Sequence, residues 1–412
     1  MYLTKEENEM LDGKHGFPVQ KAMEILVGLG ECYDAEKMIP VSSAHILTFA
    51  FGTGKAWNLH IKELAAQGGK FVIFTDTNPI SIDRYAWREM GISEKDANEQ
   101  LSLDRAVVKM GACLSHTCSH YLIGNTPRKG EHVAWSESSA VVFANSVLGA
   151  RTNREGAPSS LAAALTGRVP AYGYHLDENR HGEMKIRITA KLQDLTDYGT
   201  LGYFVGNVAE DKIPVLVGMP ANITSNELKI MGAAMATSGS IALYHAVGIT
   251  PEAPTEEAAF GGRKATESLT IEFGDKELRE TEALLDKAPG KVDMVMFGCP
   301  HASISEIGNI ATRLSGKKVK AGVDVWILSS VMMKRYAEAT GYLETIEAAG
   351  ARIICDGCPS NWPADTLKNR GRTMAATNSA KLTYYIEGGQ DVLSHYGSTE
   401  RCLEAALTGE WR

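Results

Sequence analysis

Residues 292–297 read Val-Asp-Met-Val-Met-Phe, and this largely apolar run decides the fold of the chain. It predicts a strand, after which the hydrophobic spacing changes to that of a helix. The alternation continues as a helix over 304–314, a strand over 323–328, a helix over 332–349 and a strand over 351–355. This βαβαβ order predicts an α/β fold with a parallel sheet and right-handed crossovers.

The rest of the chain repeats these signals more weakly. Helix spacing of apolar residues predicts helices over 19–29, 56–66, 135–147 and 225–236, and apolar runs predict strands over 71–74 and 213–218. The polar residues 75–78 are expected at the carboxyl end of the strand 71–74, and 250–262 as a connection or mobile loop. Because 412 residues exceed one hydrophobic core, we expect several packed α/β units, with domains at 1–130, 131–280 and 281–412.

Composition and charge narrow the class of function. The formal net charge is −8 and no long Lys/Arg run is present, which argues against nucleic acid and favours a small-molecule ligand. No stretch approaches the roughly 20 apolar residues that cross a bilayer, so we expect a cytoplasmic protein with no membrane partner. The seven cysteines are scattered and odd in number, unlike a disulfide framework. We therefore expect reduced thiols or metal ligands.

Three cysteines stand where a ligand could reach them. Cys299 and Cys358 each lie between Gly and Pro beyond a predicted strand, and parallel sheets bind ligands at that edge. Ser303 and Glu306 have the spacing of a capping box, so a helix N-terminus is expected to favour the thiolate of Cys299. Together with Cys118, in an apparent loop, they would hold an iron-containing centre with an open coordination position.

The alternative is that these thiols are small buried core residues, as most free cysteines are. We assign Cys32, Cys113, Cys355 and Cys402 to that class. Cys113 and Cys355 lie within five residues of a proposed ligand and could take its place.

Five segments together resemble the aconitase X family. They are Thr-Cys-Ser-His-Tyr at 117–121, Trp-Ser-Glu-Ser-Ser-Ala at 135–140, Ala-Asn-Ser-Val-Leu-Gly-Ala-Arg-Thr-Asn at 144–153, Gly-Cys-Pro-His at 298–301 and Thr-Asn-Ser-Ala-Lys at 377–381. The resemblance implies an aconitase-like arrangement of three α/β domains with parallel sheets around a central cleft. It also implies an iron–sulfur cluster or mononuclear iron held by Cys118, Cys299 and Cys358.

The resemblance also implies that the protein is a dehydratase and that one domain of the aconitases is not part of this chain. Family members dehydrate cis-3-hydroxy-L-proline or mevalonate 5-phosphate. The swivelling domain of aconitases, which carries a serine thought to remove the substrate proton, is expected to be absent from this chain. We therefore expect a separate small subunit that supplies this serine, and no catalytic base in the present sequence.

The remaining site residues are assigned from their chemistry and from these motifs. Iron would bind the departing hydroxyl as a Lewis acid, and His301, His45 and Glu137 are the candidates for hydrogen bonding or proton transfer. Arg151 is expected to grip the substrate carboxylate with its planar guanidinium. The other expected substrate ligands are Thr77, Asn78, Ser138, Asn145, Thr152, Asn153, Ser379 and Lys381. Each could equally be a structural donor, cap or turn residue.

The substrate expectation rests on the lack of a phosphate-binding loop. The segment Gly52-Thr53-Gly54-Lys55 lacks the strand and the spacing of such a loop, and the sequence has no GxxxxGK[ST] pattern. We therefore favour cis-3-hydroxy-L-proline, with mevalonate 5-phosphate as the alternative. A hypothesis of another class is a non-catalytic iron–sulfur regulatory protein.

Overall fold

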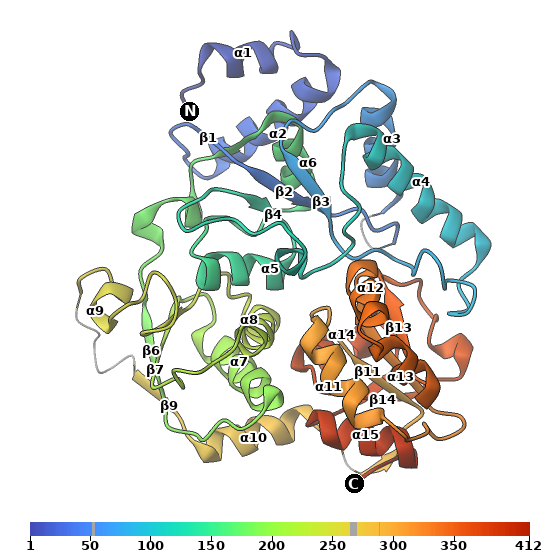
Figure 1. Cartoon of the computed structure of the whole chain (residues 1–412). Coiled ribbons are helices and arrows are strands. Elements are labelled where there is room, and N and C mark those ends of the chain that lie inside the picture. The colour runs from blue at the N-terminus through green and yellow to red at the C-terminus, as the bar shows by residue number, and fades with distance from the viewer. Residues whose placement is uncertain (52–53, 264–269, 288) are drawn as a thin grey trace.

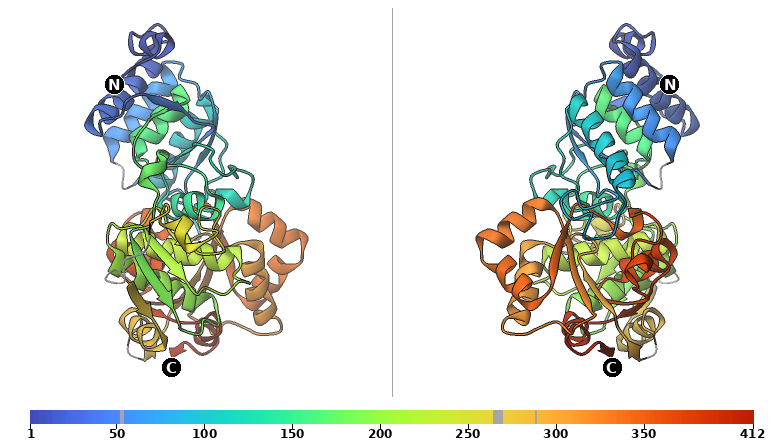
Figure 2. Two further views of the ribbon diagram at one scale, coloured as in Figure 1. Left: turned by 90° about the vertical axis from the view of Figure 1, so that its left-hand side faces the viewer. Right: turned by 90° about the vertical axis from the view of Figure 1, so that its right-hand side faces the viewer.

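The computed structural model describes residues 1–51, 54–263, 270–287 and 289–412, so Gly52 and Thr53 lie outside the described residues. Three α/β units form the molecule (Figure 1). The first lies at the top of the view, and the second and third lie side by side beneath it. The turned views also show the first unit above the other two (Figure 2). Within the described ranges, no helix is long and apolar enough to cross a bilayer.

The first unit is built on a parallel sheet of order β3-β2-β4. Its strands are β2 (Ser43–Ile46), β3 (Phe74–Thr77) and β4 (Ala134–Trp135). Helices α2 and α6 pack together against it over an apolar core that includes Met23, Leu26 and Leu165. The helices are α1 (Lys5–Leu11), α2 (Phe17–Cys32), α3 (Lys55–Ala66), α4 (Glu94–Met110), α5 (Ser138–Val142) and α6 (Ala157–Thr166), and β1 (Met38–Pro40) pairs with β5 (Arg168–Pro170).

The second unit has a parallel sheet of order β8-β7-β6-β9. The strands are β6 (Met184–Ile188), β7 (Pro214–Val217), β8 (His245–Ala246) and β9 (Thr270–Phe273). Helices α7 (Leu195–Ala209) and α8 (Ser225–Gly239) pack closely at Gly202. A Cβ at this position would lie only 2.2 Å from Met231 O, so the contact requires glycine. The short α9 (Glu256–Ala259) and α10 (Asp275–Leu285) complete the unit.

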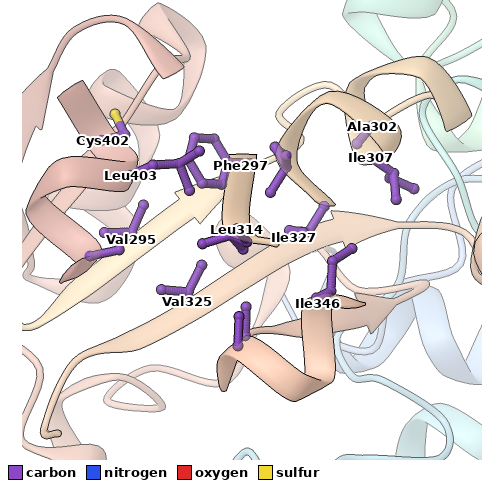
Figure 3. Close-up of a cluster of buried hydrophobic side chains, with 14 of the residues drawn as sticks. Val295, Phe297, Ala302, Ile307, Leu314, Val325, Ile327, Ile346, Cys402 and Leu403 are labelled. Atoms are coloured by element: carbon purple, nitrogen blue, oxygen red, sulfur yellow. The ribbon is translucent and has the colours of Figure 1, made fainter. Parts of the chain in front are cut away.

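The third unit contains the five-stranded parallel sheet β13-β12-β11-β14-β15. Its strands are β11 (Met294–Phe297), β12 (Asp324–Ser329), β13 (Arg352–Cys355), β14 (Met374–Thr377) and β15 (Leu393–Tyr396), and β10 (Gly290–Lys291) pairs with β16 (Glu410–Trp411). The helices are α11 (Ile304–Leu314), α12 (Val331–Ala339), α13 (Tyr342–Ala349), α14 (Ala380–Gln390) and α15 (Thr399–Thr408). Val295, Phe297 and Ile327 of the sheet share one apolar cluster with Ile307 and Leu314 of α11 (Figure 3).

The strand order of the third unit locates a ligand site. The chain runs from β11 outward to β13 and then returns to β14 on the other side of β11. A doubly wound sheet opens a crevice beyond the carboxyl ends at such a reversal. Residues 298–303 and 378–379 occupy the loops at this crevice.

The helices and strands predicted around 292–355 are confirmed, with one correction. The predicted helix 332–349 is two helices, because Gly341 adopts a left-handed conformation with φ +77° between α12 and α13. The parallel pairing of the strands, predicted from the βαβαβ order, is also confirmed.

Two predictions in the first unit are wrong in position. The strand expected over 71–74 begins at Phe74, because Phe71 and Val72 donate their N–H groups to helix ends rather than to the sheet. The helix expected from 135 begins at Ser138, because the Glu137 carboxylate accepts from Ala140 N and caps it there. This helix continues as a π-helix over Phe143–Leu148 and ends at Gly149 as predicted.

Candidate active site

A cavity of about 220 Å³ lies between the first and third units, at the carboxyl ends of their parallel strands. The first unit contributes Leu47, Phe49, Asn78, Pro79, Cys118, Ser136, Glu137 and Ser138. The third contributes Gly298, Cys299, His301, Leu328, Cys358, Pro359, Ser360, Asn361, Lys381 and Tyr385. Loops that are far apart in the chain therefore meet at one small chamber.

Cys118, Cys299 and Cys358 all contribute to the wall of this cavity. Cys118 and Cys299 are more than nine-tenths buried, and Cys358 is partly exposed. Their charges would repel one another, Cys118 against Cys299 and Cys299 against Cys358, so the three thiols share one electrostatic environment. Three thiols from three separate loops are the donor set that soft metal centres use.

Burial opposes the thiolate form of Cys299 that was expected beside the helix N-terminus. The capping box predicted at the start of α11 is present: Glu306 accepts from Ser303 N, and the Ser303 hydroxyl accepts from Glu306 N. Burial raises the pKa of the Cys299 thiol to about 12, despite the opposing effect of Lys381. A bound cation is therefore needed to draw the proton from this buried thiol.

His301 lies two residues after Cys299 and contacts the other two cysteine loops. Its Nδ1 is 3.0 Å from Thr117 Oγ1 and its Nε2 is 3.2 Å from Gly357 O. Its backbone N–H donates to Cys118 Sγ at 3.2 Å. Burial lowers the pKa of the imidazole to about 4, so the ring is neutral near pH 7.

Lys381 and Glu137 form a buried ion pair in the cavity wall. Lys381 Nζ lies 2.7 Å from Glu137 Oε1 and 3.3 Å from Ser139 Oγ. The second carboxylate oxygen of Glu137 accepts from Ser139 Oγ and Ala140 N, so the carboxylate has partners on both oxygens. Burial alone would lower the pKa of Lys381, but Glu137 raises it above its ordinary value.

His45 lies behind the cavity wall in a second polar group. Its Nδ1 is 2.7 Å from Asp76 Oδ1, its Nε2 is 3.3 Å from Asn78 Oδ1, and its ring stacks on His120 with 3.7 Å between centroids. One ligand atom from each of His45, Asp76 and His120 lies within 4.8 Å of the others, a spacing that could hold a metal ion. Burial lowers the pKa of His120 to about 3, which leaves this imidazole neutral.

Three polar residues that were predicted to bind the substrate lie at different positions relative to the cavity. Ser138 lines the cavity at the start of α5. Ser379 is not among the lining residues; its hydroxyl donates to Cys299 O and accepts from Leu382 N, which caps α14. Thr77 lies outside the wall, with its Oγ1 2.9 Å from His116 Nδ1.

The structure does not bring the segment 145–153 to the cavity. Asn145 donates to Thr152 O and Ala242 O at 2.9 Å and so crosslinks loops of the first and second units. Arg151 pairs with the exposed Asp177 and donates to His175 O. Thr152 donates to Asn153 O, and Asn153 in turn donates to Tyr172 O.

The other four cysteines lie outside the cavity wall. Cys355 and Cys402 are buried, as expected. Cys32 and Cys113 are exposed, so their assignment to the core was wrong. Cys32 is the last residue of α2, and Cys113 lies beyond α4 in an isolated parallel bridge with Asp76, and both side chains are exposed.

Family models decide the relationship of the chain. Models described as the aconitase X first, second and third domain match residues 1–178, 182–283 and 292–408. The chain belongs to the aconitase X family. The resemblance seen in the five motif segments is thereby confirmed.

Relatives within the aconitase X family are named as dehydratases. The chain is 42% identical to the phosphomevalonate dehydratase large subunit of Methanothermobacter thermautotrophicus, over 94% of each chain. It is 36% identical to the cis-3-hydroxy-L-proline dehydratase of Pseudomonas aeruginosa, over 98% of this chain and 69% of that protein. The chain is a dehydratase of this family, which sets aside the non-catalytic alternative.

A solved aconitase X structure has the same fold. The crystal structure titled Thermococcus kodakaraensis aconitase X (holo-form) matches with a TM-score of 0.87 and 38% identity. The match covers 98% of this chain and 100% of that one. The expected aconitase X arrangement of parallel α/β domains is therefore confirmed.

Several residues near the aconitase X cavity were missed in the sequence. Tyr385 stands four residues after Lys381 on α14, so helix periodicity alone places it on the same face. His120 lies within the Thr-Cys-Ser-His-Tyr motif but was not weighed as a ligand. Asp76 carries no local signal, because only the parallel pairing of β2 with β3 sets it beside His45.

Proposed function

We propose that this chain is the metal-carrying large subunit of a dehydratase that acts on mevalonate 5-phosphate. The observation that carries this proposal is the meeting of Cys118, Cys299 and Cys358 in one cavity with the Lys381 ammonium. The choice of substrate is supported by relatives named phosphomevalonate dehydratase large subunit, which this chain matches over nearly their whole length. This proposal replaces the earlier preference for cis-3-hydroxy-L-proline.

The thiols fit an iron-containing group better than a hard cation. They are soft donors, they come from three loops, and the cavity beside them leaves room for a substrate atom. Bound there, iron in a cluster or as a single ion would supply Lewis-acid stabilisation for the departing hydroxyl. The group of His45, Asp76 and His120 is a second possible donor set, but these three side chains do not line the cavity.

Lys381 is proposed to bind the substrate carboxylate. Its contacts with Glu137 and Ser139 occupy two of the three N–H donors of an ammonium group, which leaves one for a ligand. Glu137 is proposed to hold Lys381 charged and oriented, because its own oxygens all have partners. Asn78 and Ser138 offer neutral polar groups to the same space.

Both candidate substrates are β-hydroxy acids, so the chain's residues would serve either in the same way. The proton leaves the carbon beside the carboxylate and hydroxide leaves the next carbon. The base is proposed to be a serine of a small partner subunit. The relatives named large subunits imply such a partner.

One observation favours cis-3-hydroxy-L-proline as a second candidate. Among the described lining residues, Glu137 and Lys381 are the charged side chains, and their charges cancel. A phosphate monoester would need further cationic or N–H donors, which the partner subunit would have to supply.

A substrate comparison tests the proposal. The chain is copurified anaerobically with its small subunit, and the loss of water from each compound is followed by mass spectrometry. We expect kcat/KM for mevalonate 5-phosphate to exceed that for cis-3-hydroxy-L-proline by at least about tenfold, or about 1.4 kcal/mol. The reverse preference would select the second candidate, and turnover of neither would reject both.

Metal analysis tests the donor set separately. Replacing Cys118, Cys299 or Cys358 by Ala is expected to remove most of the iron, whereas Cys402→Ala, at a buried thiol outside the cavity, should retain it. Loss of iron in His120→Ala with full retention in the three cysteine variants would move the site to the His45 group.

A further inference from the structure

His301 joins the three cysteine loops through its side chain and its backbone. It belongs to the loop of Cys299, and its ring lies between Thr117, which precedes Cys118, and Gly357, which precedes Cys358. The distances are 3.0 Å from Nδ1 to Thr117 Oγ1 and 3.2 Å from Nε2 to Gly357 O. One imidazole therefore spans all three thiol-bearing segments.

The chemistry of these partners assigns the ring protons. A carbonyl oxygen only accepts, so Nε2 must carry the hydrogen and donate it to Gly357 O. In the neutral ring Nδ1 is then an acceptor, which the hydroxyl of Thr117 satisfies as donor. Both nitrogens are thus occupied by protein groups, and neither lone pair nor N–H is left to exchange a proton with a substrate.

The backbone of His301 extends the same junction to the second unit. Its N–H donates to Cys118 Sγ at 3.2 Å, and its carbonyl accepts from Ser119 Oγ at 3.3 Å and from Lys229 Nζ at 3.1 Å. Lys229 lies on α8 of the second unit, is 2% exposed, and pairs with Glu306 on α11. Residues of all three units therefore meet at His301.

We propose that His301 is a positioning residue, which holds the three cysteine loops at the spacing a metal centre needs, and is not an acid or base. The inference rests on the thiol metal site of the proposed function. Hydrogen-bonded partners of this kind orient metal ligands, and their loss typically costs about 10- to 100-fold in metal affinity.

The test compares variants that keep or break individual bonds. In His301→Gln the amide N–H can still reach Gly357 O, whereas His301→Ala breaks both side-chain bonds. Thr117→Val leaves the imidazole intact but removes its bond to Nδ1, together with the acceptor that Thr117 Oγ1 offers to Ser119 N at 3.1 Å. The matched control is His245→Gln, because His245 is also buried and bonds a backbone carbonyl, Arg180 O at 2.7 Å, but lies outside the cavity wall.

The readouts are iron release to a chelator and the labelling rate of the thiols in the apoprotein. We expect release to be about 10- to 100-fold faster in His301→Ala and within about threefold of wild type in His301→Gln. Thr117→Val should lie between them and His245→Gln should match the wild type. Labelling of Cys118, Cys299 and Cys358 by an aromatic disulfide should accelerate in the same order.

Two results separate this inference from the proposed function. If His301→Ala keeps its iron and its labelling rate but loses turnover, His301 is a proton carrier and the positioning role is rejected. If the wild type binds no iron, the proposed metal site fails, but the labelling rates still decide whether His301 holds the loops together. A far-ultraviolet circular dichroism spectrum confirms that each variant is folded.

Discussion

Lys381 keeps its charge inside the protein because Glu137 lies 2.7 Å away. Both side chains are about nine-tenths covered. Burial alone would raise the pKa of Glu137, yet Lys381 and the N–H of Ala140 hold it below its ordinary value. The charge of each side chain therefore depends on the other. The pair as a whole carries no net charge, yet it offers the Lys381 ammonium as a group that can bind an anion.

Removing one partner of this pair should be costly. In Lys381→Met the Glu137 carboxylate is left buried without its cation, which we expect to lower the free energy of unfolding by about 3–5 kcal/mol at pH 7. The double variant Lys381→Met/Glu137→Gln should recover much of this loss. Urea unfolding at fixed ionic strength measures both. Lys185→Met is the control, because its partner Glu256 is partly exposed and the loss should stay below about 1 kcal/mol.

The same variants predict a pH dependence. In the wild type the folded pKa of Glu137 lies below 4.5, so its stabilising contribution is present above that pH and is lost as the pH falls through the folded value. In Lys381→Met the pKa should be raised, so acidification from pH 7 to pH 5 should narrow the gap to the wild type. Equal stability of the single and double variants would show that the pair has no such coupling.

At the scale of elements, the end of β11 shows how a strand presents a ligand. Gly298 adopts φ +88°, and a Cβ there would stand 2.1 Å from Leu328 O on the neighbouring strand β12. The chain can therefore turn toward Cys299 only with glycine at this position. This close approach couples the geometry of the sheet to that of the thiol.

Gly298→Ala should thus damage both stability and metal retention. We expect a loss of more than about 2 kcal/mol, from left-handed backbone strain and the clash with the carbonyl, together with release of iron. The control is Gly316→Ala, since Gly316 has φ +71° but open space around it and should lose only about 1–2 kcal/mol. Thermal unfolding and iron content of both variants are the measurements. Similar values for the two would mean that the contact with Leu328 is unimportant.

Elements were predictable where the signals are local. The helix 304–314 was predicted to the residue, because Ser303 and Glu306 mark its start and its apolar residues recur at helix spacing. The strand 71–74 was misplaced because its apolar side chains Val72 and Phe74 are exposed, while the polar Asp76 is buried. A hydrophobic pattern cannot report a buried polar strand whose partners lie on other segments.

At the scale of the whole molecule, the candidate site was only partly predictable. Residues at strand ends, such as Cys299 and Cys358, were found because parallel sheets place their carboxyl ends together. The sequence could not show that Arg151 turns to Asp177 or that Asp76 meets His45, because these contacts join separate segments. The tertiary arrangement thus decides which polar residues reach the cavity.

The junction of the first and third units resembles a continued sheet. Ile80 N donates to Asp356 O at 2.8 Å, and Cys358 N donates to Ile80 O at 3.1 Å. Beside this bridge Arg84 pairs with Asp356 at 3.0 Å, where the Asp356 side chain is fully buried. Because Asp356 stands two residues before Cys358, the contact between units and the position of the thiol are mechanically linked.

Breaking this ion pair should therefore weaken the junction and the metal site together. Burial already raises the pKa of Asp356, and removing Arg84 should raise it further. When the pKa of a carboxyl is higher in the folded than in the unfolded state, the fold loses stability as the pH rises from the unfolded pKa through the folded pKa. Arg84→Met should hence cost about 3–5 kcal/mol at pH 7, cost less at pH 5, and release iron faster.

The double variant Arg84→Met/Asp356→Asn is the decisive comparison. An Asn keeps the acceptor for Val331 N and tolerates the left-handed backbone at this position, φ 65°, while it removes the buried charge. It should restore most of the stability and most of the iron retention. Urea unfolding at pH 7 and pH 5, with chelator kinetics, checks both. If the double variant recovers its stability but not its iron, the junction and the thiol site are independent. The fold would then be restored without restoring metal retention at the Cys358 loop.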